Sequence, residues 1–180
     1  MIILAIGGEP ATGKSTLVQH IMKNFSNGQF HKAGALTYTH YPLSDIIVLG
    51  YYEIGNPFGG TDRLPMNVQP QAEIFIRSIN NEMFKNTLVI FEGDRLFNGS
   101  FLEFLNKEND RNIFITLRSS KTAERHALRD NQNETWLKGR KTKIENIAKK
   151  FKVVERYSDE IGDIARIAAE LFDRAEALKI

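Results

Sequence analysis

A short apolar run, a glycine-rich segment and an amphipathic stretch follow one another at the start of the chain. The run IILAI, residues 2–6, is typical of a buried strand. The stretch KSTLVQHIMKNF, residues 14–25, carries apolar side chains at helical spacing. Between them lies GGEPATGKST, residues 7–16, whose glycines allow a tight turn. This order predicts a strand that leads through a tight loop into a helix. The expected buried face of the helix consists of Leu17, Val18, Ile21, Met22 and Phe25.

The glycine-rich segment matches the pattern G-x-x-x-x-G-K-[ST]. In such a loop, successive backbone N–H groups point inward at phosphate oxygens, and the N-terminus of the following helix adds a positive dipole. We expect Lys14 to contact the β- and γ-phosphates of ATP, Ser15 to bind Mg²⁺ and Thr16 to contact the α-phosphate. The alternative is a glycine-rich turn with a chance lysine. The residues expected to hold the nucleotide are Gly8, Glu9, Pro10, Ala11, Thr12, Gly13, Lys14, Ser15 and Thr16.

Apolar, β-branched runs alternate with longer amphipathic stretches along the rest of the chain. This alternation is typical of an α/β fold, in which helical crossovers connect the strands of a mostly parallel sheet. No repeat, linker or boundary interrupts the pattern, so we expect one domain over residues 1–180. Further strands are expected within 34–41, 45–52, 87–94, 112–117 and 152–156, and further helices within 71–84, 100–109, 120–150 and 159–180.

Composition limits the cellular compartments and the partners that we expect for this protein. The chain has no cysteine, which excludes disulfides and thiolate metal sites. No apolar run approaches the roughly 18 residues that a membrane span requires. We therefore expect a soluble, cytoplasmic protein without a membrane partner, and composition leaves the oligomeric state open.

Charge is unevenly distributed. Residues 118–156 hold twelve Lys or Arg against five Asp or Glu, a net charge of +7 in a chain whose total is +2. A basic stretch of this kind suits ATP phosphates, a nucleic-acid backbone or both. A solvated helical face is the alternative interpretation.

Acidic residues follow the most apolar internal strand, LVIFE, residues 88–92. In a parallel sheet this end opens into the crevice that also holds the phosphate loop. We predict that Glu92 is the acid on the Mg²⁺ side and that Asp94 is a general base for an acceptor hydroxyl, although the two roles are interchangeable. The alternative is a helix cap at Asp94 and a structural ion pair at Glu92.

The loop GGTDRLPMNVQPQ, residues 59–71, is the expected acceptor loop. Arg63 can bind an acceptor phosphate with two parallel hydrogen bonds. Asp62 is expected to hydrogen-bond the acceptor, and is the second candidate for the general base. The alternative is a turn with an internal Asp62–Arg63 pair.

Arginines in the basic segment are candidates for contacting the transferred phosphoryl group. Arg125 and Arg129 are four residues apart and share a helical face. We expect both to act in catalysis and in nucleotide binding, and Arg140 to contact the acceptor. Such arginines stabilise developing charge and exclude water.

Together, the loop at 8–16, the acids at 92–95 and the basic segment resemble the nucleoside and nucleotide kinase branch of the P-loop kinases over essentially the whole chain. That resemblance implies a three-layer P-loop kinase fold with a basic helical lid at about residues 119–145. The segments GGTDRLPMNVQP and LRDNQNETWLKGRKTKIENI also resemble phage-encoded kinases that phosphorylate hydroxymethyluracil within DNA during thymidine hypermodification. GDRLF, residues 93–97, stands where free-nucleotide kinases carry DRY- or ERS-type signatures, and its Arg95 is a further acceptor-binding candidate.

Three functions follow as hypotheses. The favoured one is ATP-dependent phosphorylation of the hydroxymethyl group of hydroxymethyluracil in phage DNA, in the host cytoplasm if the protein is phage-encoded. The second is phosphorylation of a free nucleoside or deoxynucleoside monophosphate. The third is a nucleotide-binding ATPase or switch without an acceptor. The segment NKEND, residues 106–110, lacks the aspartate of the guanine-reading N-K-x-D motif, which disfavours a GTPase.

Overall fold

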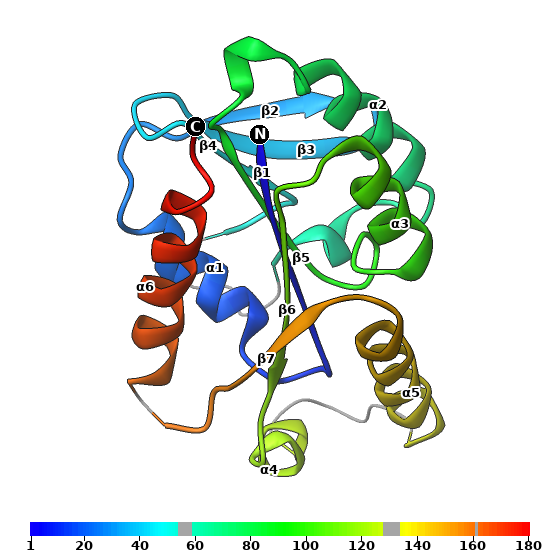
Figure 1. Cartoon of the computed structure of the whole chain (residues 1–180). Coiled ribbons are helices and arrows are strands. Elements are labelled where there is room, and N and C mark those ends of the chain that lie inside the picture. The colour runs from blue at the N-terminus through cyan, green and yellow to red at the C-terminus, as the bar shows by residue number, and fades with distance from the viewer. Residues whose placement is uncertain (54–58, 128–133, 161) are drawn as a thin grey trace.

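One seven-stranded sheet organises the computed structural model, which describes residues 1–53, 59–127, 134–160 and 162–180 (Figure 1). Along the sheet the strands lie in the order β2-β3-β4-β5-β1-β6-β7. The strands are β1 (Ile2–Gly8), β2 (Gln29–Ala33), β3 (Leu36–Tyr41), β4 (Ile46–Leu49), β5 (Leu88–Glu92), β6 (Asn112–Arg118) and β7 (Val153–Tyr157). The helices are α1 (Lys14–Met22), η1 (Thr61–Arg63), α2 (Gln69–Ile79), η2 (Glu82–Phe84), α3 (Gly99–Glu108), α4 (Thr122–Ala127), α5 (Glu134–Lys150) and α6 (Asp163–Glu176).

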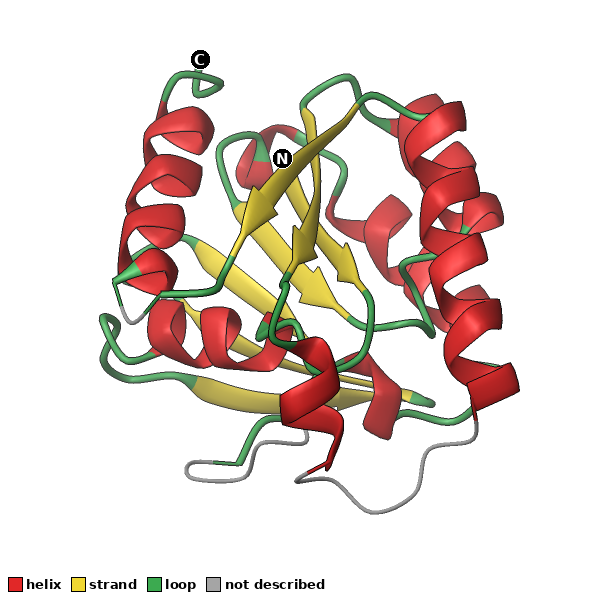
Figure 2. Ribbon diagram, turned by 90° about the horizontal axis from the view of Figure 1, so that it is seen from below, coloured by secondary structure: helices red, strands yellow, loops and turns green. Residues whose placement is uncertain are grey.

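The five strands β4, β5, β1, β6 and β7 are parallel, so their carboxyl ends meet at one edge of the sheet. Strand β1 lies at the centre of these five, between β5 and β6. The chain leaves β1 for α1, which covers one face, whereas α2 and α3 cover the other face (Figure 1). A crevice opens where the connections diverge in this way, beyond the carboxyl ends of the strands. Figure 2 is seen from this end of the sheet.

Side chains that alternate along β1 supply two cores, one on each face of the sheet. Ile2, Leu4 and Ile6 pack with α1 and α6, whereas Ile3 and Ala5 pack with α2, α3 and α5. All of these β1 side chains are buried, as expected for a central parallel strand covered on both faces. The helices on the two sides are separated by the sheet in both views (Figures 1 and 2). The prediction of a three-layer, mostly parallel α/β fold is confirmed.

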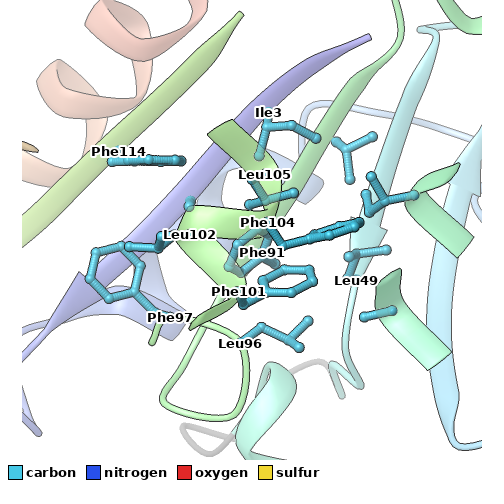
Figure 3. Close-up of a cluster of buried hydrophobic side chains, with 14 of the residues drawn as sticks. Ile3, Leu49, Phe91, Leu96, Phe97, Phe101, Leu102, Phe104, Leu105 and Phe114 are labelled. Carbon is cyan, nitrogen blue, oxygen red and sulfur yellow. The ribbon is translucent and has the colours of Figure 1, made fainter. Parts of the chain in front are cut away.

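Phenylalanines from β5 and α3 form the centre of the core on the α2, α3 and α5 face (Figure 3). The rings of Phe91 and Phe101 meet edge to face, with their centroids 5.5 Å apart. Phe97 extends this cluster to the start of the glycine-rich loop, since a Cβ at Gly7 would lie 2.1 Å from its ring. Close packing at Gly7 therefore fixes the position at which the loop leaves β1.

One strand is missing from the sequence predictions. Strand β2 was not predicted, because its residues are mostly exposed and polar and it pairs only with β3, antiparallel, at the edge of the sheet. In α2, Ala72, Ile76 and Ile79 are buried, whereas Ile74 is exposed.

The expected lid at about 119–145 corresponds to α4 and the first part of α5. Residues 128–133, which separate these helices in sequence, lie outside the described part of the chain. Near its C-terminus α5 is part of the helical layer, since Ile144 and Ile147 are buried in the core. The basic helix is therefore anchored to the sheet at one end. Among the described residues, no helix is both long enough and apolar enough to span a membrane.

Candidate active site

The loop between β1 and α1 depends on glycine backbone conformations. Gly8 has φ 143°, and a Cβ there would lie 2.5 Å from the carbonyl oxygen of Leu117 in the neighbouring strand β6. Gly13 precedes α1 in the left-handed region, with φ 88°. Both conformations are costly for residues with a side chain. These two glycines therefore wrap the chain tightly around the N-terminus of α1, where backbone N–H groups favour an anion.

Lys14 folds back across this loop. Its ammonium Nζ donates hydrogen bonds to the carbonyl oxygens of Gly8, at 3.2 Å, and Glu9, at 3.0 Å. Hydrogen bonds from an ammonium to phosphate oxygens are stronger than those to neutral carbonyls. The lysine is thus already held at the loop, where it can contact a phosphate.

Ser15 and Glu92 join the loop to the end of β5. The Ser15 hydroxyl donates a 2.8 Å hydrogen bond to Oε1 of Glu92. Glu92 is buried, with 1% of its surface exposed. The pKa of Glu92 is raised from 4.5 to about 7, chiefly by burial and also by the negative charges of Asp62 and Asp94, whereas Lys14 and the Ser15 hydrogen bond oppose the rise. A cation at this position would offset the cost of burying the charge.

The oxygen donors of this pair fit Mg²⁺. Magnesium prefers hard oxygen ligands and is usually bound by one or two protein groups, the rest of its shell being water and phosphate. A serine hydroxyl and a buried carboxylate in contact meet that requirement. Among the described residues, no group of three or more His, Asp or Glu side chains could hold a metal by itself.

The predicted acceptor loop docks on the same strand end. The Thr61 hydroxyl donates to the backbone oxygen of Glu92 at 2.7 Å, and the backbone N–H of Arg95 donates to Oδ1 of Asp62 at 3.3 Å. A Cβ at Gly60 would lie 2.1 Å from Oε1 of Glu92, so only glycine allows this approach. The structure therefore brings Asp62 beside the end of β5. Residues 54–58, which lead into the loop, are outside the described part of the chain.

Asp94 is engaged by the basic helix α5. Arg140 approaches its Oδ2 at 2.9 Å, and Lys143 Nζ lies 3.4 Å from its Oδ1 and donates to its backbone oxygen at 3.1 Å. The Arg140 guanidinium also lies over the ring of Trp136, 5.0 Å from its centroid. Both carboxylate oxygens of Asp94 therefore face cations from α5.

Of the two further arginines predicted to bind the acceptor, Arg63 lies in the acceptor loop and Arg95 contacts it. Arg63 lies 3.6 Å from a carboxylate oxygen of Glu53 and 4.9 Å from the ring centroid of Tyr51, beyond the end of β4. The Nε of Arg95 donates to the backbone oxygen of Leu64 at 3.3 Å.

Arg125 reaches the phosphate loop from α4. Its guanidinium donates to the backbone oxygens of Ala11, at 3.2 Å, and Ser158, at 2.9 Å. Its predicted partner Arg129 lies outside the described residues. Within the loop, Glu9 pairs with Arg118 at 3.2 Å, and Thr16 is exposed at the start of α1.

Several residues at this edge were not among the predicted site residues. Ser158, directly after β7, donates to the backbone oxygen of Thr12 at 2.6 Å, and Arg118 links Glu9 to Glu155. Their position in the sequence could have identified them as site residues, because both lie at the carboxyl ends of parallel strands. A cavity of about 280 Å³ opens beside them; it is lined by Ala11, Gly13, Thr16, Arg125, Ser158, Asp159, Glu160 and Ile164.

The site thus combines an anion-binding loop, a lysine, a pair of oxygen ligands for a cation, and a second loop with an exposed carboxylate. These are the parts that transfer of a phosphoryl group requires, because that reaction depends on positioning and on offsetting negative charge.

Three solved structures resemble the whole chain at low identity. They are an uncharacterized protein from Eubacterium ventriosum ATCC 27560 (13% identity, TM-score 0.49, 98% of each chain covered), a gluconokinase from Sinorhizobium meliloti 1021 (15%, 0.45, 96% of this chain and 97% of that one) and a shikimate kinase from Bacteroides thetaiotaomicron (13%, 0.48, 97% and 98%). With TM-scores below 0.5, they support no conclusion on substrate. No curated protein matches the chain.

The family comparison covers most of the sequence. Residues 1–164 match the family described as P-loop Nucleotide Kinase3, and this range includes the glycine-rich loop, the acceptor loop and the basic helices. Because the match extends over far more than half of the chain, and because the loop and the acid at the end of β5 have the geometry of such a site, the protein belongs to the P-loop Nucleotide Kinase3 family.

Proposed function

We propose that this P-loop kinase transfers the γ-phosphate of ATP to the hydroxymethyl group of hydroxymethyluracil in phage DNA. The observation that carries the phosphotransferase part is the double contact of Glu92. Its side chain accepts from Ser15 of the phosphate loop, and its backbone oxygen accepts from Thr61 of the acceptor loop. A donor site and an acceptor site that share one strand end are arranged for direct transfer between them.

The donor half consists of the loop and its supports. Lys14 and the N-terminus of α1 bind the phosphates, and Ser15 with Glu92 binds Mg²⁺. The metal, when bound, offsets negative charge on the β- and γ-phosphates. The cavity of about 280 Å³ beside Gly13 and Ser158 is adjacent to this loop and suits the base and ribose of ATP. Arg125 joins that cavity to the loop through its two backbone hydrogen bonds.

The acceptor half needs a group that accepts the hydroxyl proton. Asp62 and Asp94 were both candidates, and their surroundings differ. Asp94 is held by Arg140 and Lys143, whereas Asp62 is exposed beside Glu92 and accepts a hydrogen bond from the backbone N–H of Arg95. We therefore assign the base to Asp62, and assign Asp94 the task of holding Arg140 and Lys143 at the reaction edge.

In the proposed reaction, the acceptor hydroxyl oxygen forms a bond to the γ-phosphorus, and the bond between that phosphorus and the β–γ bridging oxygen breaks. ADP leaves with the electron pair of the broken bond. The hydroxyl proton passes to the carboxylate of Asp62. Lys14 and Arg140 contribute positive charge where negative charge accumulates.

DNA as the acceptor is supported by charge and by sequence. Residues 118–156 carry a net charge of +7, and Arg140 and Lys143 of this segment lie at the reaction edge. A base within DNA would have to leave the stack to reach the γ-phosphate. Phosphorylation of a free deoxynucleotide is the second candidate, favoured by the family description and by cavities of single-nucleoside size.

An acceptor competition separates the two candidates. The protein is incubated with γ-labelled ATP, duplex DNA containing hydroxymethyluracil, unmodified duplex of the same sequence, and a panel of free nucleosides and nucleotides. The expected result is label on the modified duplex alone. Label confined to free nucleotides contradicts the DNA proposal, and label released only as inorganic phosphate contradicts both kinase candidates. Binding to the duplex should weaken steeply with salt, because counterions are released.

A further inference from the structure

A cavity of about 310 Å³ opens between the acceptor loop and the hairpin formed by β2 and β3. Two cationic side chains line it, Lys32 from β2 and Arg63 from the acceptor loop. The ring of Tyr51 forms part of its wall, and the other described residues that line it are uncharged. Two cations without an acid among these lining residues favour an anionic ligand.

The cavity lies at the edge of the sheet where transfer is proposed. Lys32 pairs in register with Thr37, whose backbone oxygen accepts a 2.8 Å hydrogen bond from the N–H of Gly50, the residue after β4. Lys32 is therefore level with the carboxyl end of β4. Arg63 directly follows Asp62, the proposed base. A ligand held between Lys32 and Arg63 thus borders the acceptor side of the site.

The guanidinium of Arg63 is positioned by its neighbours and is open to a ligand. It lies over the ring of Tyr51, 4.9 Å from the centroid, and 3.6 Å from a carboxylate oxygen of Glu53. The ring of Phe30 meets the ring of Tyr51 edge to face, with centroids 6.0 Å apart. Stacking on an aromatic face leaves the N–H donors in the plane of the guanidinium, where they can bind phosphate oxygens. The Arg63 side chain is 39% exposed, so such a ligand can reach it.

Lys32 supplies the second positive charge. It is exposed on β2 and lies on the same face of the sheet as Phe30, two residues earlier. Among the described residues, no group forms an ion pair or a hydrogen bond with its ammonium. The hairpin that carries Lys32 is fixed, because its turn packs on α2: a Cβ at Gly34 would lie 2.6 Å from the side-chain oxygen of Gln71. Since Glu53 offsets one of the two cations, the pair keeps a net positive charge.

We propose that Lys32 and Arg63 bind a phosphate group carried by the acceptor, and so place the acceptor hydroxyl at Asp62. The inference rests on the proposed kinase function and specifies its acceptor as a nucleotide, not a bare nucleoside. The phosphate belongs either to the 5′-monophosphate of a free nucleotide or to the backbone of DNA, which offer the same anionic oxygens. Phosphate contacts of this kind fix the position of a nucleotide without reading its base.

Binding is measured first, because it does not depend on transfer. Calorimetric titrations with 5-(hydroxymethyl)-2′-deoxyuridine and with its 5′-monophosphate are run at saturating Mg²⁺ and ADP, which occupy the phosphate loop. The wild type should prefer the monophosphate at least about 20-fold. Lys32→Met removes the charge and keeps the length of the side chain, so it should reduce this preference about 5- to 10-fold, and Arg63→Met should do the same. The control Lys107→Met makes the same change at an exposed position of α3, outside the cavity, and should keep the wild-type preference.

Steady-state rates test whether the phosphate can belong to DNA. Two duplexes that contain hydroxymethyluracil are compared at saturating ATP, one with native linkages and one with neutral methylphosphonate linkages on both sides of the modified nucleotide. If the bound phosphate belongs to DNA, the neutral linkages should raise the duplex KM of the wild type about 5- to 10-fold. In Lys32→Met the same replacement should change KM less than about 2-fold, because the contact is already lost.

The outcomes separate this inference from the kinase function. An effect of Lys32→Met with only one of the two acceptors supports the phosphate site and identifies the source of the phosphate. A wild type that shows neither a preference for the monophosphate nor a difference between the duplexes overturns the inference, even if it labels an acceptor. A preference that both Lys32→Met and Arg63→Met retain also overturns it, because the phosphate then binds elsewhere. A preference that depends on Lys32, in a protein that labels no acceptor, supports the phosphate site and contradicts the kinase function alone.

Discussion

Replacing Glu92 by glutamine should stabilise the nucleotide-free protein at neutral and alkaline pH while removing a group needed for its proposed activity. The substitution keeps the size of the side chain and an oxygen that can accept the hydrogen bond from Ser15. It removes the carboxylate of a residue at the end of β5 that is only 1% exposed. The expected gain comes entirely from the ionised form of Glu92, so it must depend on pH.

The direction in which stability changes with pH follows from the pKa of Glu92 in the folded state. Burial, the largest cause, raises the pKa of Glu92 from 4.5 to about 7. Below pH 4.5 both folded and unfolded chains hold the proton, and the stabilisation is fully present. Between pH 4.5 and 7 the unfolded chain releases the proton first, so the free energy of unfolding falls as pH rises. At about 1.4 kcal/mol per pKa unit, the total loss in the wild type is about 3.5 kcal/mol.

Urea unfolding followed by circular dichroism measures this loss. Wild type and Glu92→Gln are compared at pH 5 and pH 8, without Mg²⁺ or nucleotide, so that groups titrating equally in both proteins cancel. The advantage of the variant should grow by about 2 to 3 kcal/mol between the two pH values. The control Glu82→Gln, whose carboxylate is 92% exposed, should differ from wild type by less than about 0.5 kcal/mol at either pH.

An advantage of Glu92→Gln that does not change between pH 5 and pH 8 would refute the reasoning, because it would show that the carboxylate is solvated or already paired in the folded state. An advantage that shrinks toward pH 8 would reverse the sign and have the same consequence. Added Mg²⁺ and nucleotide should stabilise the wild type more than the variant, since only the wild type has the carboxylate oxygens.

Three further substitutions have defined outcomes. Lys14→Ala removes the ammonium at the phosphate loop and should lower transfer of label from ATP at least about 100-fold, with an unchanged circular dichroism spectrum. Gly60→Ala puts a Cβ 2.1 Å from Oε1 of Glu92 at φ 88°, and should lower the free energy of unfolding by about 1 to 3 kcal/mol in urea titrations; an unchanged midpoint would contradict this close approach. Arg140→Ala breaks a partly exposed pair with Asp94, so it should cost less than about 1 kcal/mol of stability but reduce kcat by 10-fold or more; equal kcat would remove Arg140 from the site.

The local sequence was sufficient to predict those strands and helices that short sequence patterns specify. Strand β1, the glycine-rich loop and α1 follow directly from an apolar run, a motif and a helical periodicity, and the structure agrees with each. The parallel strands β5 and β6 were equally clear, because strands buried on both faces are continuously apolar. Strand β2 escaped prediction since an exposed edge strand needs no apolar run, and its partner β3 supplies the pairing.

For residues far apart in the sequence, only the region in which they meet could be predicted, and not the contacts between them. The rule that parallel strands end at one edge placed Glu92 near the phosphate loop, but not in contact with Ser15, which is 77 residues away in the sequence. The pairing of Asp94 with Arg140 and Lys143 depends on how α5 packs through Ile144 and Ile147.

The sequence by itself determined the phosphate loop, because the backbone conformations of Gly8 and Gly13 and the position of Lys14 arise within ten consecutive residues. It also determined the α/β class, through the alternation of buried strands and amphipathic helices. Only the tertiary structure decided which side chains meet there. Glu92, Thr61 and Arg140 come together since the carboxyl ends of parallel strands and the packing of α5 converge on one edge, whatever the distance between these residues along the chain.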